Sequence, residues 1–219
     1  GPRSPLPEVR PLPAGEPGEV VVRGRCVFRG YEAREHLGFD PNEGAFAAGG
    51  WLRTGDKGWL GASSAHLTLT GRFKEIINRA GEKISPLAVE HSLLAACDSA
   101  GELHAMVRGL LAFAQPHDEM GEVVGVAAVC EPGKTVSLSA IRRAGRKGGL
   151  GQRWLPEVLV LLPSLPKGPT GKPARIGLSE ELRLPRLSLA SSMKNLDLRR
   201  GGVADYETEQ RGQARRAAK

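Results

Sequence analysis

The sequence is poor in cysteine and aromatic residues and contains no long apolar run. Its three cysteines, Cys26, Cys97 and Cys130, are far apart and form no CxxC pair, so neither a zinc site nor a disulfide framework is supported. Scattered thiols with apolar neighbours fit a reducing compartment. Because no run of about 18 apolar residues and no signal peptide is visible, we expect a soluble intracellular protein, cytoplasmic or organellar, with peroxisome and plastid both open.

Several common catalytic patterns are also missing. No G-x-S-x-G motif occurs, and no catalytic triad can be assembled. The histidines show no metal-ligand spacing, so no metal site is assigned to them. The chain has no initiator methionine and starts in a Pro/Gly-rich stretch, from which we expect a fragment.

Positive charge exceeds negative charge, but unevenly. The chain has 31 Lys and Arg against 24 Asp and Glu, a net charge of +7. Residues 186–219 contribute eight basic and four acidic residues, which is +4 of that total. The sequence pI of about 9.7 could suggest nucleic acid, yet the rest of the chain is only weakly basic and Tyr206 is the single aromatic residue of the tail. We therefore expect a solvated, disordered tail and no nucleic-acid partner.

What the sequence does contain predicts an α+β fold. A chain of 219 residues, a fifth of them Gly or Pro, suits one or two domains with many turns. In the first part, Glu19-Val20-Val21-Val22-Arg23-Gly24 reads as a short strand that ends at the glycine. The alternating run Leu67–Thr70 faces Trp59-Leu60 across a turn, so residues 16–70 are predicted to form a small β-rich unit.

The second part predicts a compact α/β domain of about 110 residues, a common domain size. Ser85-Pro86 has the form of a helix start, and apolar spacing continues that helix to Cys97. A second helix is predicted over 137–147, and apolar runs predict strands at 110–114, 123–130 and 158–162. The expected domain is a three-stranded sheet with flanking helices.

Residues 71–86 join these two parts. Gly71 follows the alternating strand and allows a sharp turn, a charged segment follows, and Ser85-Pro86 then starts the helix. This stretch, together with Gly50-Trp51-Leu52-Arg53-Thr54-Gly55-Asp56 and Leu165-Pro166-Lys167-Gly168-Pro169-Thr170-Gly171-Lys172, closely resembles motifs of the adenylate-forming superfamily, the acyl-CoA synthetases and their relatives. The three motifs stand in the family's order and spacing, and the resemblance covers roughly residues 10 to 185.

The resemblance implies a domain plan and an activity. Residues 1–70 would end the N-terminal adenylation region, 71–75 would be a hinge, and 76–185 a mobile C-terminal lid, followed by the basic tail 186–219. The complete enzyme, an acid–thiol ligase of fatty acid or carboxylate metabolism, would use ATP and Mg²⁺ to convert a carboxylic acid into acyl-AMP and pass the acyl group to CoA. The family's phosphate loop and Tyr-Gly-x-Thr-Glu motif are absent from these residues. We therefore expect an upstream N-terminal synthetase domain as partner, and no adenylation by this chain alone.

The resemblance also assigns site residues. Asp56 and Arg72 would bind the nucleotide ribose, Lys74 would be the hinge, Gly81 would lie beside the pantetheine channel and Lys83 would face phosphate or CoA. Lys172 would reach the carboxylate substrate and the α-phosphate, a role that suits a compact, mobile positive charge. Each has a plainer alternative: a turn residue for Asp56 and Gly81, a surface salt bridge for Arg72, and a solvated side chain for Lys74.

Three other functions remain open from the sequence. An adenylation module of a peptide synthetase shares these motifs but delivers the acyl group to a carrier protein, and no carrier serine motif is present here. A non-catalytic nucleotide- or CoA-binding module could keep the same edge. Nucleic-acid binding through the basic tail is the third, and it is disfavoured because Tyr206 is the only aromatic residue that accompanies the charges.

Overall fold

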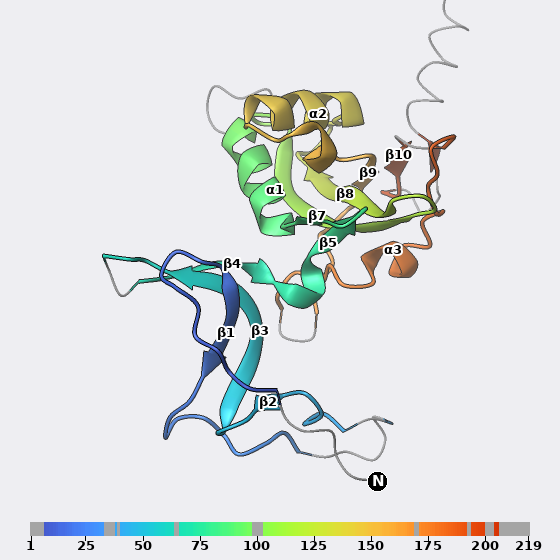
Figure 1. Cartoon of the computed structure of the whole chain (residues 1–219). Coiled ribbons are helices and arrows are strands. Elements are labelled where there is room, and N and C mark those ends of the chain that lie inside the picture. Colours follow the sequence, from blue (N-terminus) through green and yellow to red (C-terminus); the bar gives the residue numbers. More distant parts are fainter. Residues whose placement is uncertain are drawn as a thin grey trace, which may run out of the picture. The chain divides into compact units, whose positions relative to one another are not determined.

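The computed structural model describes residues 7–32, 38, 40–63, 66–97, 103–168, 171–191, 194–199 and 204–205. The chain divides into two compact units, Gly1–Lys74 and Glu75–Lys219. The boundary falls inside the segment 71–75 that the sequence analysis expects to be a hinge, and a short 3₁₀ helix, η2 (Phe73–Glu75), contains it. Each unit has its own sheet (Figure 1), which confirms the predicted α+β class.

Unit 1 is a small antiparallel sheet. Its central strand β3 (Trp51–Leu60) pairs with β1 (Gly18–Val22), β2 (Phe46–Ala47) and β4 (Leu67–Arg72). The β3–β4 hairpin is the predicted one, with longer strands than the sequence indicated. Among the described residues of this unit, Ala47 is the only buried apolar residue, so the sheet has little core of its own.

Unit 2 is organised around the antiparallel hairpin of β7 and β8, against which β9 packs in parallel. These three strands are the predicted ones, and the sheet continues beyond them. The short hairpin of β5 and β6 joins through Arg79 and Gly121, while β10 pairs in parallel with β9 and β11 follows β10. The strands are β5 (Ile77–Arg79), β6 (Glu82–Ile84), β7 (Val107–His117), β8 (Gly121–Cys130), β9 (Val158–Leu161), β10 (Lys194–Asp197) and β11 (Ala204–Asp205).

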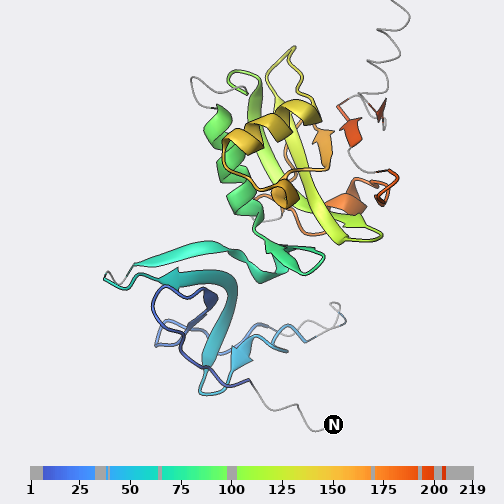
Figure 2. The ribbon, with the colours of Figure 1, turned by 45° about the horizontal axis from the view of Figure 1, so that its top comes forward.

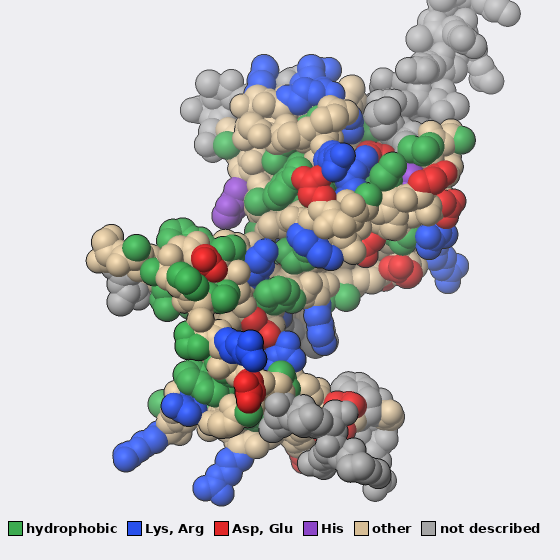
Figure 3. Space-filling view, in the orientation of Figure 1, with side chains coloured by type: hydrophobic (Ala, Val, Ile, Leu, Met, Phe, Trp, Pro, Cys, Tyr) green, Lys and Arg blue, Asp and Glu red, His purple; other side chains and the backbone are tan. Residues whose placement is uncertain are grey.

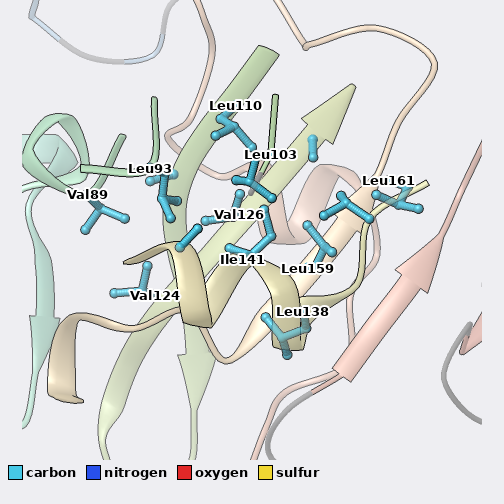
Figure 4. Close-up of a cluster of buried hydrophobic side chains, with 14 of the residues drawn as sticks. Val89, Leu93, Leu103, Leu110, Val124, Val126, Leu138, Ile141, Leu159 and Leu161 are labelled. Atoms are coloured by element: carbon cyan, nitrogen blue, oxygen red, sulfur yellow. The ribbon is translucent and has the colours of Figure 1, made fainter. Parts of the chain in front are cut away.

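The two longer helices of unit 2 cover one face of this sheet. Figure 2 shows α1 (Pro86–Leu94) and α2 (Leu138–Lys147) on the same side of β7, β8 and β9. Ser85 caps α1, as predicted, by accepting a hydrogen bond from the Ala88 N–H at 3.3 Å. Helix α1 ends three residues earlier than predicted, and a 3₁₀ turn, η3 (Ala95–Cys97), completes the segment. Leu93, Val126, Ile141 and Leu159 are among the fully buried side chains between helices and sheet (Figure 4).

The other face of the sheet has a second core. There Phe113 and Val160 pack with Leu178 of the short helix α3 (Leu178–Glu181), and with Leu187 and Leu196. Gly125 lies directly across from Phe113, and a Cβ on Gly125 would come within 2.5 Å of the phenyl ring, so only glycine fits there. The sheet of unit 2 is therefore covered on both faces.

The predicted disordered tail does not hold for residues 187–191 and 194–199. Leu187, Asn195 and Leu196 are buried, and β10 forms a full parallel ladder with β9. The strand was missed because its sequence, Lys-Asn-Leu-Asp, has only one apolar residue, and its burial comes from pairing with a distant strand. The end of the tail, residues 206–219, lies outside the described residues.

Basic side chains gather over α2 (Figure 3), where Arg143, Arg146 and Lys147 follow one another along the helix. Two of them lie in its last turn, where the helix dipole favours positive charge. Arg142 differs because it is buried and donates to the Pro156 carbonyl, and this burial lowers the pKa of its guanidinium.

No helix in the described part of the chain is long and apolar enough to cross a bilayer.

None of the three cysteines, all in the described part of the chain, forms a disulfide. Cys26 is exposed, whereas Cys97 and Cys130 are half-buried. Burial raises the pKa of the Cys130 thiol, which keeps it protonated and weakly reactive near neutral pH.

Candidate functional site

Asp56 and Arg72, the two residues expected at a nucleotide ribose, lie side by side in unit 1. They are direct partners across β3 and β4, and Arg72 Nε is 2.8 Å from Asp56 Oδ1. The Asp56 backbone N–H is held by Thr54 Oγ1, which itself donates to the Val20 carbonyl. Both side chains remain accessible, with Asp56 27% and Arg72 54% exposed. The sheet thus presents a carboxylate oriented by a guanidinium at the end of the unit next to the boundary.

Lys74 is the last residue of unit 1. It lies in η2 with an exposed side chain. Its position at the boundary suits the expected hinge, and its role stays a prediction.

Gly81 and Lys83 lie on the β5–β6 hairpin of unit 2. Ala80 and Gly81 form its two-residue turn, both in the left-handed region with φ of +46° and +89°. No described atom would lie within 4 Å of a Cβ on Gly81. In this structure the conformation, rather than close packing, requires a glycine there. Lys83 is exposed and pairs across the hairpin with Asn78.

The hairpin is fastened to the rest of unit 2. Its own Ile77 and Ile84, which pair across the two strands, are fully buried. On its outer side, Glu82 accepts a hydrogen bond from Trp154 Nε1 at 2.7 Å and pairs with Arg153 at 3.4 Å. Trp154 belongs to the 3₁₀ turn η4 (Gln152–Trp154), so the hairpin and this turn hold each other in place.

A pocket of about 560 Å³ lies beside the hairpin. None of the residues that the sequence analysis singled out lines it, although Glu82, between Gly81 and Lys83, does. The lining residues are Glu82, Ala88, Ser92 and the run 149–154. Within the described ranges, no group of three or more His, Cys, Asp or Glu side chains could hold a metal ion.

Lys172 stands on a closed loop of unit 2. The Gly168 N–H donates to the Lys172 carbonyl at 2.8 Å, and the Ala174 N–H donates to the Pro166 carbonyl at 3.0 Å. These bonds join the two arms of the loop, with Gly171 in the left-handed region at φ +77°. The Lys172 side chain is exposed, and Pro169 and Thr170 lie outside the described residues. The loop therefore carries an accessible ammonium on a backbone with fixed ends.

The structure adds charged residues that the sequence analysis did not single out. Arg175, Glu75 and Glu90 form a buried ionic cluster at the base of the Lys172 loop. The sequence could have pointed to Arg175, because it follows Lys172 by only three residues. Glu90 carried no such signal, because a single carboxylate on an apolar helix becomes informative only when its buried partner is known.

Curated relatives match most of the chain. It is 35% identical over 180 residues to a protein named probable CoA ligase CCL9 from Humulus lupulus, which is 82% of this chain and 31% of that protein. It is 37% identical over 163 residues to a salicylyl-CoA synthase / salicylate adenylyltransferase of a Streptomyces species, covering 74% of this chain and 27% of that protein. No protein-family model matches the sequence.

Solved structures give the same picture. The o-succinylbenzoate CoA synthetase MenE of Bacillus subtilis, determined with the acyl-adenylate OSB-AMP, superposes on 80% of the chain with a TM-score of 0.61 and 28% identity. ATP-bound MatB of Rhodopseudomonas palustris superposes on 83% with a TM-score of 0.65; at 24% identity, this likeness supports the fold.

The chain spans about a third of the length of these relatives. The motifs around Asp56, Arg72 and Lys172, the relatives and the fold all point the same way. The chain belongs to the adenylate-forming superfamily of acyl-CoA synthetases and their relatives, and it corresponds to the C-terminal portion of these enzymes.

Proposed function

We propose that this chain is the C-terminal part of an acyl-CoA synthetase, which activates a carboxylic acid with ATP and transfers the acyl group to CoA. The observation that carries the proposal is Lys172, exposed on a closed loop inside the family's lysine motif. Membership of a family whose named relatives are CoA ligases supports it. The upstream part of the enzyme would supply the acid-binding pocket and the phosphate loop.

Lys172 would act in the first half-reaction. A carboxylate oxygen of the substrate attacks the α-phosphorus of ATP, the bond to the bridging oxygen of the β-phosphate breaks, and pyrophosphate leaves. Two anionic groups approach each other in this step, and an ammonium between them would stabilise the transition state. The long, flexible lysine stem allows the charge to reach the reacting atoms from a loop whose ends are held.

Asp56 and Arg72 would hold the nucleotide. A carboxylate can accept hydrogen bonds from both hydroxyls of a ribose, and the 2.8 Å contact with Arg72 keeps the Asp56 carboxylate oriented. A carboxylate acceptor beside a guanidinium donor fits a ribose. Mg²⁺, which the family implies, would accompany the ATP phosphates, and no residue of this chain is assigned to it.

Lys74, Gly81 and Lys83 would serve the change between half-reactions. Lys74 stands at the unit boundary, where rotation of one backbone residue would reorient the following unit. The Ala80-Gly81 turn would then face the pantetheine arm of CoA, with the exposed Lys83 beside it as a positive charge for phosphate.

The test joins this chain to the upstream part of its own gene product and screens carboxylic acids for AMP release, with and without CoA. We expect CoA-dependent turnover. Lys172→Ala should slow formation of the acyl-adenylate by about 10²- to 10³-fold, the usual effect of removing one group that stabilises transition-state charge. Lys167→Ala is the matched control, because it removes the same charge from the other arm of the same loop and should leave the rate nearly unchanged.

Other outcomes would separate the alternatives. Equal rates for Lys172→Ala and wild type would remove the proposed role of the lysine. Acyl-AMP formation with no transfer to CoA would favour an adenylation module that serves a carrier protein. Absence of turnover with every acid would favour a non-catalytic binding module. Rapid AMP formation by the 219-residue chain alone would contradict the proposal that the upstream part of the enzyme is required.

A further inference from the structure

Arg175 is a buried guanidinium between two carboxylates. It is 8% exposed, and its Nη1 lies 2.5 Å from Glu90 Oε1 and 3.1 Å from the Ala112 carbonyl oxygen. Its Nε lies 3.1 Å from Glu75 Oε2, an ion-pair contact without hydrogen-bond alignment. The side chains of Glu75 and Glu90 are 17% and 11% exposed. A charge removed from water in this way needs its partners, because a buried ion without them is strongly destabilising.

Glu90 and Arg175 together bind the backbone N–H and carbonyl of Ala112, at the edge of β7 that does not face β8. Glu90 Oε1 also accepts a hydrogen bond from the Ala112 N–H at 2.7 Å, while Arg175 donates to the Ala112 carbonyl. Ala112 lies in β7, whose other edge pairs with β8. The two side chains therefore give Ala112 the donor and acceptor that a neighbouring strand would supply. This bonding ties Arg175 both to helix α1 and to the central hairpin of the sheet.

The same arginine lies next to two functionally placed segments. On one side, Arg175 directly follows Ala174, whose N–H closes the base of the Lys172 loop. On the other side, its partner Glu75 directly follows Lys74, at the boundary between the units. The segment that follows Lys74 and the base of the lysine loop are thus bound to one buried group, although about a hundred residues separate them in the chain.

We propose that Arg175 is a positioning residue that fastens both Glu75 and the Lys172 loop to unit 2. The inference deepens the proposed function and rests on it. By holding Glu75, the arginine confines backbone rotation to Lys74 and the residues before it. By holding the base of the loop, it fixes the backbone from which the Lys172 side chain extends. Each backbone rotation at Lys74 would then move the lysine loop together with the rest of unit 2 as a rigid body.

The first test is hydrogen exchange on the 219-residue chain and requires no turnover. Arg175→Lys keeps the positive charge but replaces a five-donor fork with a single ammonium, which cannot bridge both carboxylates and the carbonyl. We expect the N–H groups of Gly168, Gly171 and Ala174 to exchange about tenfold faster, while β8 keeps its protection. Arg186→Lys is the matched control, because Arg186 pairs with Asp118 at an exposed site of the same unit. Unchanged exchange in the loop of a folded Arg175→Lys protein would overturn the proposal.

A second variant tests the same proposal if the Arg175→Lys protein does not fold. Glu75→Gln leaves the contacts of Arg175 with Glu90 and Ala112 in place and removes only the charge beside the boundary. We expect faster exchange at residues 75–77 and in the loop, with β7 and β8 unaffected. Protection equal to wild type at both places would also count against the proposal.

The third measurement uses the complete enzyme. If Arg175 positions the lysine, Arg175→Lys should lower kcat for acyl-adenylate formation about tenfold while KM for ATP changes less than about threefold, the pattern of an interaction needed in the transition state. A rise in KM with unchanged kcat would overturn the positioning role. If the complete wild-type protein shows no turnover, the proposed function fails, yet the exchange experiment still decides whether Arg175 holds the loop.

Discussion

At the scale of single residues, the turn between β5 and β6 places an alanine where its side chain is unfavourable. Ala80 has φ +46° and an exposed side chain, and Gly81 follows with φ +89°. A two-residue turn with both φ values positive favours Asn-Gly. Ala80→Asn should therefore raise the free energy of unfolding by up to about 1 kcal/mol, measured by urea denaturation. Gly81→Ala should lower it by a similar amount, and equal shifts in the same direction would contradict the assigned turn.

Motif residues could be predicted at this scale, and buried partners could not. Asp56, Arg72 and Lys172 stand in motifs with fixed spacing, which pointed to them without a fold. Arg175 and Glu90 form an ion pair only because the chain brings residues from α1 and the lysine loop to the edge of β7. The Asp56–Arg72 contact was also out of reach, because it depends on the register of β3 and β4.

At the scale of elements, the sequence pattern found the strands with continuous apolar runs, the alternating hairpin and the two longer helices. These are β1, β7, β8 and β9, the β3–β4 hairpin, and α1 and α2. It missed β5 and β6, which have three residues each with charged positions, and β10, which has one apolar side chain. Pairing with distant strands, rather than local sequence, decides the conformation of such short segments.

The assignment of β10 to the sheet gives a prediction. Leu196 is 3% exposed in the second core, whereas Leu189 of the same segment is 68% exposed. Leu196→Ala should lower the free energy of unfolding by about 2–5 kcal/mol, because it removes buried apolar surface and leaves a cavity. Leu189→Ala, the same change at a surface position, should alter it by less than about 0.5 kcal/mol. Equal, small effects in thermal or chemical denaturation would mean that β10 does not complete the core.

At the scale of the whole molecule, the two units differ in how much apolar surface they bury. In the described part of unit 1 only Ala47 is a buried apolar residue, whereas unit 2 has two cores on opposite faces of its sheet. Since local stability follows buried apolar contacts, hydrogen exchange of the 219-residue chain should be at least about a hundredfold faster in β1 and β3 than in β8. Similar protection in both sheets would show that unit 1 has stabilising contacts beyond its own core.

The position of the second core along the chain has a consequence for biosynthesis. Phe113 and Val160 are covered by Leu178, Leu187 and Leu196, which leave the ribosome after the strands that they cover. Until those residues emerge, one apolar face of a nearly complete sheet stays exposed, and such intermediates aggregate readily. We therefore expect nascent chains stalled before about residue 178 to bind chaperones strongly and to release them once β10 can pair with β9. Pairing of β10 with β9 would thus time the completion of the second core.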